Sequence, residues 1–562
     1  MRFYKRISLK LLFISIILVI IFPLLILGDF QQDDFYISSL NNLNFNSSLS
    51  SIFSQFSNRP LAAIFFSILS IFFYSYEHFF LLNIILILFS CNFIIKAFNE
   101  YFISRSSRVI FTALCLVPIY SYSTIFSSGM QIVGNLSIFI WSISIYFLNK
   151  FIKTDKFTYL MASNIVLFSM FITYESAFPL IILNLFLPFF KKNLIKFKHI
   201  FITLILTLIL SVIVQKLILP HLFNQDISRL RVDNLNLNSF ILYMGANLLL
   251  LLNIFYIFFQ NFNESLRIIL NSNILLAQFL SSLSIFFLMI LINYKENLMI
   301  KLKDNNNFLI ISLIICFFVL LVFMHTVAKS AINIYGINNR ALVSLSFFIP
   351  LILILLSNMK SPKYFFFIIL IYTFLIITNY IPIQYNNITY VKERNTSFKK
   401  ITKKINIDYG KGNNSFIYLD QFNNNSLFNH TTYANDNFDF SNMIGFNHYN
   451  TQNDNSIWSA NIRNSMFCNK AYWNLHFKKK IFNVIRLSKK IYFIEKNNDQ
   501  YVLKEFNDYN LFKKFIEKKI ICSSDMFYQD FINSKFNKIS NKDFINNSHL
   551  IKKAMDIYIS IN

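Results

Sequence analysis

Charged residues are scarce in this chain of 562 residues: they make up 14% of it, against 55% for hydrophobic residues. The mean hydropathy is +0.49. Soluble domains carry about 25% charged residues, so this composition excludes an ordinary water-soluble protein. Long Ile, Leu and Phe runs fill the first two thirds, whereas Asn, Lys and Asp dominate from about Tyr385 onward. The sequence therefore predicts a membrane domain followed by a domain in water.

Cysteine is also rare, and the five cysteines show no metal-binding spacing. The absence of a Cys-x-x-Cys pair excludes the common zinc motifs. Cys91, Cys115 and Cys316 lie within apolar runs, which is typical of small buried hydrophobic residues. Cys468 and Cys522 stand alone in the polar tail, where an oxidising compartment would permit one disulfide between them.

Acidic residues are outnumbered, with 27 Asp and Glu against 52 Lys and Arg and a formal net charge of +25. The basic residues lie at the ends of apolar runs and throughout the tail, and they form no stripe with interleaved base-stacking aromatic residues. We therefore expect membrane lipid, and no nucleic acid, as a partner.

A membrane span needs about 20 apolar residues to cross about 30 Å of hydrocarbon. The stretch Leu61–Tyr74 is shorter, and we predict a re-entrant or interfacial helix there. The first run resembles a signal sequence but has no small-residue cleavage site, so we interpret it as a retained span. The candidate spans are Leu9–Leu27, Phe79–Ile95, Val109–Ile125, Ile132–Leu148, Phe157–Tyr174, Ala177–Phe190, Ile200–Leu219, Phe240–Phe259, Ile274–Ile292, Phe308–Met324, Ala341–Leu356 and Tyr364–Ile383.

The basic loops indicate which ends of these spans face the cytoplasm. Loops around Lys96, Lys150 and Lys191 fall on one side by simple alternation. Alternation fails later in the chain, and one segment between Ser239 and Asn293 is therefore predicted not to span. About 11 transmembrane helices follow, with up to 13 as the alternative.

The domain organisation follows from these spans. Residues 1–383 form the helical membrane domain, and 29–77 form its first external loop. Residues 384–562 form an external soluble α/β domain. In it we predict a strand at Ser415–Leu419, a hairpin of Ile491–Glu495 with Gln500–Glu505, and a helix at Leu511–Lys519.

Two adjacent carboxylates, Asp33 and Asp34, follow the first span by a few residues. A carboxylate at the mouth of a helical bundle can accept a proton from an attacking hydroxyl, or hold a divalent cation against a diphosphate. The alternative is that the pair only caps and solvates a loop.

Further ionisable residues stand at span mouths on the same predicted side. Arg59 precedes an apolar stretch, where it either snorkels to lipid phosphate or binds the phosphate of a lipid-linked donor. Glu175 lies between two apolar runs, either in a wet corner or at a functional site. His78 begins a span, and Lys329 and Arg340 flank a late external connection. Carboxylates and cations around one cavity would bind a hydroxyl acceptor and a phosphate leaving group together, which indicates glycosyl transfer.

At these positions the chain resembles the GT-C superfamily of membrane glycosyltransferases, in particular its protein O-mannosyltransferase-like branch. Two positions depart from the family pattern: Tyr174 stands where a basic residue is usual, and the turn Ser127–Met130 lacks its arginine. The matching residues, all within Met1–Leu356, are Asp33-Asp34, Arg59-Pro60-Leu61, His78 with Asn83, Tyr174-Glu175-Ser176-Ala177 and Asn339-Arg340.

The resemblance implies transfer of a sugar from a polyprenyl-phosphate carrier to a glycan, lipid or protein acceptor on the external face of a bacterial inner (plasma) membrane. It assigns the catalytic base to Asp33 or Asp34. Arg340, with Arg59 or Lys329, would hold the carrier phosphate. His78 and Glu175 would be supporting residues. No cofactor is assigned with certainty, and a divalent metal is left open.

Two other functions compete with this one. A transporter or flippase of lipid-linked glycans would need inverted repeats and helices broken by Gly or Pro. The chain has only 8 Gly and 9 Pro, which disfavours such helices. A structural scaffold whose tail binds cell-envelope polymers is the third alternative.

Overall fold

The computed structural model describes most of the membrane domain and part of the tail. In the membrane domain and the residues just after it, the structure describes residues 2–28, 59–72, 75–102, 104–121, 123–126, 132–219, 237–260, 262–298, 307–327, 332, 341–357, 366–385, 388–389 and 396. In the tail it covers residues 414–419, 458–462, 490–497 and 500–519.

The membrane domain is built of apolar helices, because only a helix satisfies its own backbone hydrogen bonds within one segment surrounded by lipid. They are α1 (Arg2–Ile16), η1 (Ile17–Ile21), α2 (Phe22–Leu27), α5 (Pro60–Phe72), α6 (Tyr76–Ala97), α7 (Arg105–Cys115), η2 (Ile119–Ser121), α8 (Ser123–Phe126), α9 (Ile132–Thr154), α10 (Phe157–Phe171), η3 (Glu175–Leu180), α11 (Ile181–Phe190), η4 (Leu194–Lys196), α12 (Phe197–Ile213), η5 (Val214–Ile218), α14 (Leu237–Gln260), α15 (Phe262–Leu270), α16 (Asn273–Leu298), α17 (Asn307–Val327) and α18 (Val343–Ser357). A last helix spans Phe366–Tyr385.

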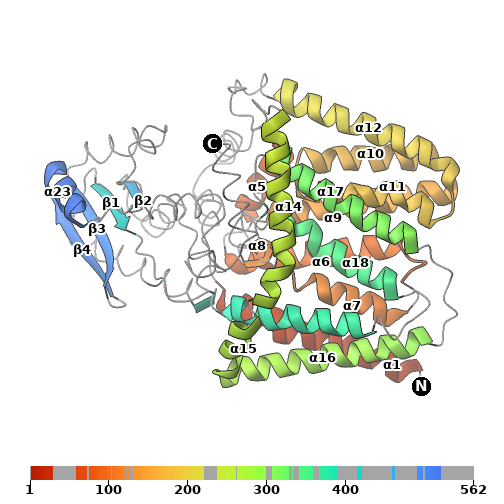
Figure 1. Cartoon of the computed structure of the whole chain (residues 1–562), viewed down its shortest axis with the longest axis horizontal. Helices are drawn as coiled ribbons and strands as arrows, with labels where there is room; N and C mark the ends of the chain where they lie inside the picture. The colour runs from red at the N-terminus through yellow and green to blue at the C-terminus, as the bar shows by residue number, and fades with distance from the viewer. Residues whose placement is uncertain are drawn as a thin grey trace.

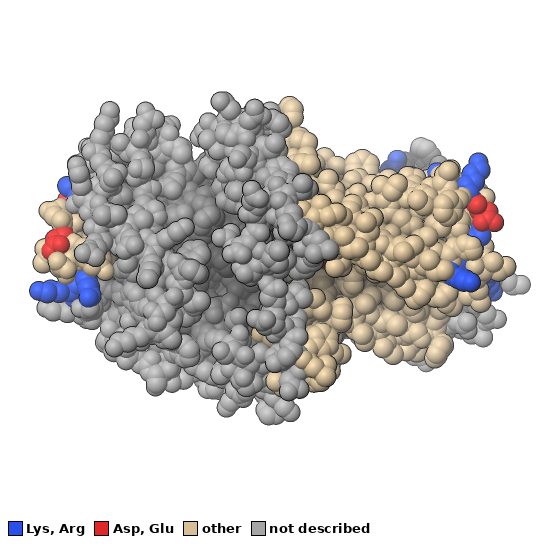
Figure 2. All heavy atoms as spheres, turned by 90° about the horizontal axis from the view of Figure 1, so that it is seen from above, with Lys and Arg blue, Asp and Glu red and all other residues tan. Residues whose placement is uncertain are grey.

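Seven described helical segments are long and apolar enough to cross a membrane. Many of their large apolar side chains are exposed, and a soluble protein rarely leaves so much apolar surface in water. On the face drawn in Figure 2, charged side chains gather toward the right-hand end, and the tan surface between them and the grey atoms shows none. The chain is therefore a polytopic helical membrane protein. The seven segments are Leu9–Leu27, Tyr76–Ala97, Ile132–Thr154, Leu194–Ile213, Asn273–Glu296, Phe308–Val327 and Phe366–Tyr385.

Helices α6 and α9 pack in parallel at the centre of the bundle. Near their starts, Asn135 Nδ2 donates to Asn83 Oδ1 at 2.6 Å. Near their ends, Asn149 Nδ2 donates to the Lys96 carbonyl at 3.2 Å. Between the end of α6 and the start of α9, the chain runs back through α7, η2 and α8. This segment is broken, whereas the sequence predicts one continuous helix at Val109–Ile125.

Helix α14 runs across the bundle, whereas its neighbours run along it (Figure 1). It packs against the end of α17, where the Phe240 and Phe323 rings lie 6.1 Å apart. That one segment between Ser239 and Asn293 does not span stays a prediction, and α14 is the segment to which it applies. Helix α5 has 13 residues, so it is about 20 Å long, and its predicted interfacial position stays a prediction.

The described tail contains a four-stranded sheet in the order β2-β1-β3-β4. Its strands are β1 (Asn414–Leu419), β2 (Trp458–Ile462), β3 (Lys490–Asn497) and β4 (Gln500–Phe506), followed by α23 (Tyr509–Lys519). The predicted hairpin is confirmed, because β3 and β4 pair antiparallel. Strand β2 was not predicted, and it pairs in parallel with β1.

Aromatic packing joins the helix of the tail to its sheet. Phe512 and Phe515 of α23 contact Phe493 and Phe506, with ring centres 5.0 to 6.3 Å apart.

The cysteines of the apolar runs lie where the sequence predicts. Cys91 and Cys115 are buried and Cys316 is half-buried. The predicted pair Cys468 and Cys522 lies outside the described residues.

Candidate functional site

The predicted site residues Arg59 and Glu175 meet, although 116 positions separate them in the sequence. Arg59 Nη2 lies 2.5 Å from Glu175 Oε1, and Arg59 Nε donates to Glu175 Oε2 at 3.2 Å. The Glu175 side chain keeps 45% of its surface exposed and Arg59 keeps 21%. Each charge is therefore compensated, while both groups stay accessible.

Tyr174 also contacts Arg59. The guanidinium carbon of Arg59 lies 4.6 Å from the centre of the Tyr174 ring, a cation–π contact. The resemblance predicts a basic residue at this position, next to the glutamate. In this chain the cation facing Glu175 comes from Arg59 in a different element, and position 174 supplies an aromatic face instead.

A break in the helical path exposes Glu175. Helix α10 ends at Phe171, and the amide of Tyr174 donates to the carbonyl of Met170 at 3.0 Å. Tyr174 is extended, with φ −164° and ψ 132°, and η3 begins at Glu175. A carboxylate in the first turn of a helix is favoured by the unbonded amides there.

The segment η3 is held in place by several helices. Ser176 Oγ and Ser137 Oγ of α9 lie 3.0 Å apart, so η3 is tied to the centre of the bundle. It also packs against α17 and α18. Because these helices are mutually packed, the position of the Glu175 carboxylate is set by the bundle.

His325 lies in the last turn of α17 and is buried. Helix α17, which carries it, packs against η3, which begins at Glu175. The neighbouring Thr326 Oγ1 lies 3.5 Å from Asn247 Nδ2 of α14. Sequence reasoning did not predict His325 as a site residue, because a histidine at the end of an apolar helix is usually a boundary residue. The sequence observation that could have indicated His325 is its position at the end of a predicted span, on the same predicted side as Glu175.

His78 lies half-buried in the first turn of α6. Its neighbour Tyr76 is buried against Gly28, where a Cβ atom would overlap the Tyr76 ring. Gly28 is the last described residue before the loop that carries the acidic pair. The start of that loop is therefore anchored beside the start of α6.

Four predicted site residues lie outside the described residues: Asp33, Asp34, Lys329 and Arg340. The structure thus brings together Arg59 and Glu175 and adds Tyr174, whose ring contacts Arg59. Lys329 follows the end of α17 by two positions, and Arg340 directly precedes Ala341, which leads into α18.

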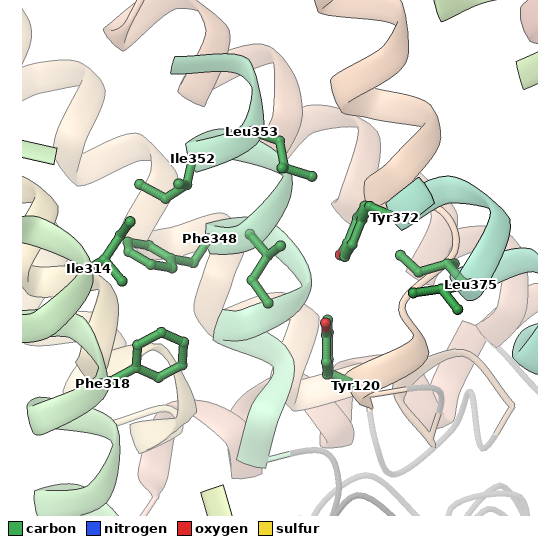
Figure 3. Close-up of a pocket in the computed structure, with 10 residues that line it drawn as sticks. Tyr120, Ile314, Phe318, Phe348, Ile352, Leu353, Tyr372 and Leu375 are labelled. Atoms are coloured by element: carbon green, nitrogen blue, oxygen red, sulfur yellow. The ribbon is translucent and has the colours of Figure 1, made fainter. Parts of the chain in front are cut away.

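An apolar cavity of about 320 Å³ lies between α17, α18 and the last helix. Its wall includes Ile314, Phe318 and Leu375, and the hydroxyls of Tyr120 and Tyr372 face each other at one side (Figure 3). Two of the helices that line it, α17 and α18, also pack against η3. The cavity and the ion pair are therefore built on the same helices.

No group of three His, Cys, Asp or Glu side chains that could hold a metal ion occurs among the described residues. Comparison with protein-family models, with curated proteins and with solved structures finds no match. The chemistry of the site is therefore argued from its own geometry.

Proposed function

We propose that this protein is an integral membrane glycosyltransferase that moves a sugar from a polyprenyl-phosphate carrier to an acceptor on the external face of the membrane. The Arg59–Glu175 pair carries the proposal: it places an accessible guanidinium and an accessible carboxylate together at one end of an apolar bundle. A lipid-linked phosphate donor needs a cation for its phosphate beside an apolar region for its chain.

Arg59 is suited to hold a phosphate without losing Glu175. A guanidinium has five N–H donors, and the Glu175 carboxylate accepts from two of its nitrogens, so donors remain for phosphate oxygens. Glu175 then keeps the guanidinium oriented before the donor arrives. Preorganised charges of this kind stabilise the charge that develops on a leaving phosphate.

The base is proposed to be Asp33 or Asp34, and Arg340 and Lys329 are proposed to assist Arg59 with the phosphate. General-base catalysis requires the acceptor hydroxyl within hydrogen-bond reach of a carboxylate. The anchoring of Gly28 against Tyr76 supports this assignment, since the acidic pair begins only five positions later.

The cavity beside Tyr372 supports the choice of a lipid-linked donor. Its apolar lining suits a segment of an isoprenoid chain, and it lies between helices that also support η3. A nucleotide-sugar donor would gain nothing from such a lining.

The proposed topology has eleven spans: the seven long segments and four shorter ones. The shorter ones are the broken segment from α7 to α8, helix α10, the η3–α11 segment and α18. The Arg59 end and the tail are then external, and α5 and α14 lie at the external surface. The membrane is proposed to be a bacterial inner membrane.

The test uses the full-length protein in detergent with a short-chain polyprenyl-phosphate sugar, following turnover and donor affinity separately. The double variant Asp33→Asn/Asp34→Asn should lose about 10² or more in turnover and keep its donor affinity. Arg59→Ala should weaken donor binding, because its contact with the phosphate forms before the transition state. Asp155→Asn, which changes a carboxylate paired with Lys196 instead, is the matched control.

Full activity in the double Asp variant would overturn the base assignment. Donor binding and carrier flipping by the wild-type protein, without any sugar transfer, would overturn the enzyme and favour the flippase.

A further inference from the structure

Lysines and aromatic rings meet where α6 and α9 end and α10 begins. Lys150 Nζ lies 4.9 Å from the centre of the Tyr146 ring and 5.4 Å from that of Tyr159. Lys96 Nζ lies 6.0 Å from the same Tyr146 ring and 5.7 Å from that of Phe93. Ammonium groups from two different helices therefore share one tyrosine ring.

Packed helices, and no long loop, position these lysines. The Asn149 side chain donates to the Lys96 carbonyl, which fixes the end of α6 against α9. The Ser144 and Ser163 hydroxyls lie 3.0 Å apart and fix α10 against α9. The backbone positions of Lys96 and Lys150 are therefore set by the packing of the helices.

Two carboxylates that closely follow α6 and α9 in the chain pair with other lysines. Glu100 lies 2.9 Å from Lys191 Nζ, and Asp155 lies 2.7 Å from Lys196 Nζ. No ion pair in the described part of the chain involves Lys96 or Lys150. Among the residues that the structure describes, the two ammonium groups therefore have no paired carboxylate.

The cluster stands at the level where a bilayer has its headgroups. Lys96 lies in the last turn of a helix long enough to span, and Lys150 lies one turn from the end of another. Figure 2 shows Lys and Arg side chains gathered at this end of the helices. Tyrosine rings and lysines at the end of a span are typical of contact with lipid headgroups.

We propose that Lys96, Lys150 and the Tyr146 ring between them form a binding site for the phosphate of an anionic phospholipid. The two ammonium groups contact the phosphate oxygens, and the apolar faces of α6, α9 and α10 receive the acyl chains. A phospholipid is favoured over free phosphate because the cluster borders exposed apolar side chains, such as Phe89 and Met161.

The test measures binding of a fluorescent phosphatidylglycerol to the full-length protein in a neutral detergent. The variant Lys96→Gln/Lys150→Gln should weaken binding about tenfold or more, since each juxtamembrane lysine contributes to the attraction. The control Lys153→Gln/Lys156→Gln removes the same charge at the same end from exposed lysines, neither of which contacts an aromatic ring in the described structure, and should change affinity less than about threefold. The variant Lys96→Arg/Lys150→Arg should retain binding, which shows that the fold tolerates both changes.

Three outcomes would overturn the proposal. Equal loss of affinity in the two Gln variants would show a general charge effect. Equal binding of a fluorescent phosphatidylcholine would remove the role of the anionic headgroup. Competition by inorganic phosphate at the same concentration as the lipid would show a site for free phosphate.

Discussion

Arg59 and Glu175 form a two-point ion pair, with Nη2 2.5 Å from Oε1 and Nε 3.2 Å from Oε2. The pair connects the residue before α5 to the first residue of η3, so it links the first loop to the centre of the bundle. It is therefore both a structural tie and the accessible charged group at this end of the molecule.

Loss of either partner should destabilise the protein slightly and affect donor binding unequally. Glu175→Gln leaves the guanidinium uncompensated, and we expect a loss of about 1 kcal/mol in the free energy of unfolding, because both groups are partly exposed. The swapped double variant Arg59→Glu/Glu175→Arg should recover most of this stability and still fail to bind the donor. Thermal unfolding in detergent and donor titration measure the two effects. Wild-type stability in the single variants of Arg59 and Glu175 would contradict a stabilising role of this ion pair.

Gly28→Ala should destabilise the protein, because the added Cβ atom would overlap the Tyr76 ring and the Leu24 carbonyl. Overpacking of this kind costs about 1–3 kcal/mol. Gly245→Ala in α14 is the matched control, since a Cβ atom there meets nothing within 4 Å. The control should be neutral or slightly stabilising, as alanine is the better helix former. Equal melting temperatures for the two variants would contradict the close packing of Gly28.

Stability should fall at high pH through Tyr101, which lies between α6 and α7. Burial, followed by the nearby Glu100 carboxylate, raises the pKa of Tyr101 from 10.0 to about 12. The unfolded chain then loses this proton first as the pH rises. The stabilisation is full below pH 10 and is lost as the pH rises through 12.

The measurement is the free energy of unfolding between pH 8.5 and 12. Tyr101→Phe removes the hydroxyl that donates to the Phe190 carbonyl at 3.0 Å, so it should be less stable at pH 8.5 and show a flatter decline. Parallel pH profiles for the variant and the wild type would contradict the assignment.

The tail should be accessible from outside. Trypsin added to right-side-out membrane vesicles should remove it, whereas Lys301 and Lys303, in the loop between α16 and α17, should be cut only after lysis. Immunoblotting of an N-terminal tag distinguishes the two cuts by size. Protection of the tail in intact vesicles would reverse the proposed orientation.

Much of the fold follows from local sequence patterns. Apolar runs long enough to cross lipid predict most of the long helices, and the alternation in Ile491–Glu495 and Gln500–Glu505 predicts a hairpin that the structure contains. The failure of charge alternation after Ser239 predicts a segment that does not span, and α14 lies crosswise (Figure 1). These features are local, because lipid and pleated strands act on each segment by itself.

The partners within the site could be predicted only in part. The unusual placement of Glu175 between apolar runs indicated an important carboxylate, and Arg59 was expected on the same side. The sequence did not predict that the two would pair directly, or that the Tyr174 ring would contact Arg59.

The amino-acid sequence by itself determined that this protein resides in a membrane, where most of its long helices lie, and which ionisable groups follow or precede apolar runs. The tertiary structure alone decided that α14 packs against the end of α17, that β2 joins β1, and that Arg59 pairs with Glu175. The physical reason is that helix and strand formation depends on neighbours a few positions away. Pairing across 116 positions depends on how whole helices pack, and no short stretch of sequence contains that information.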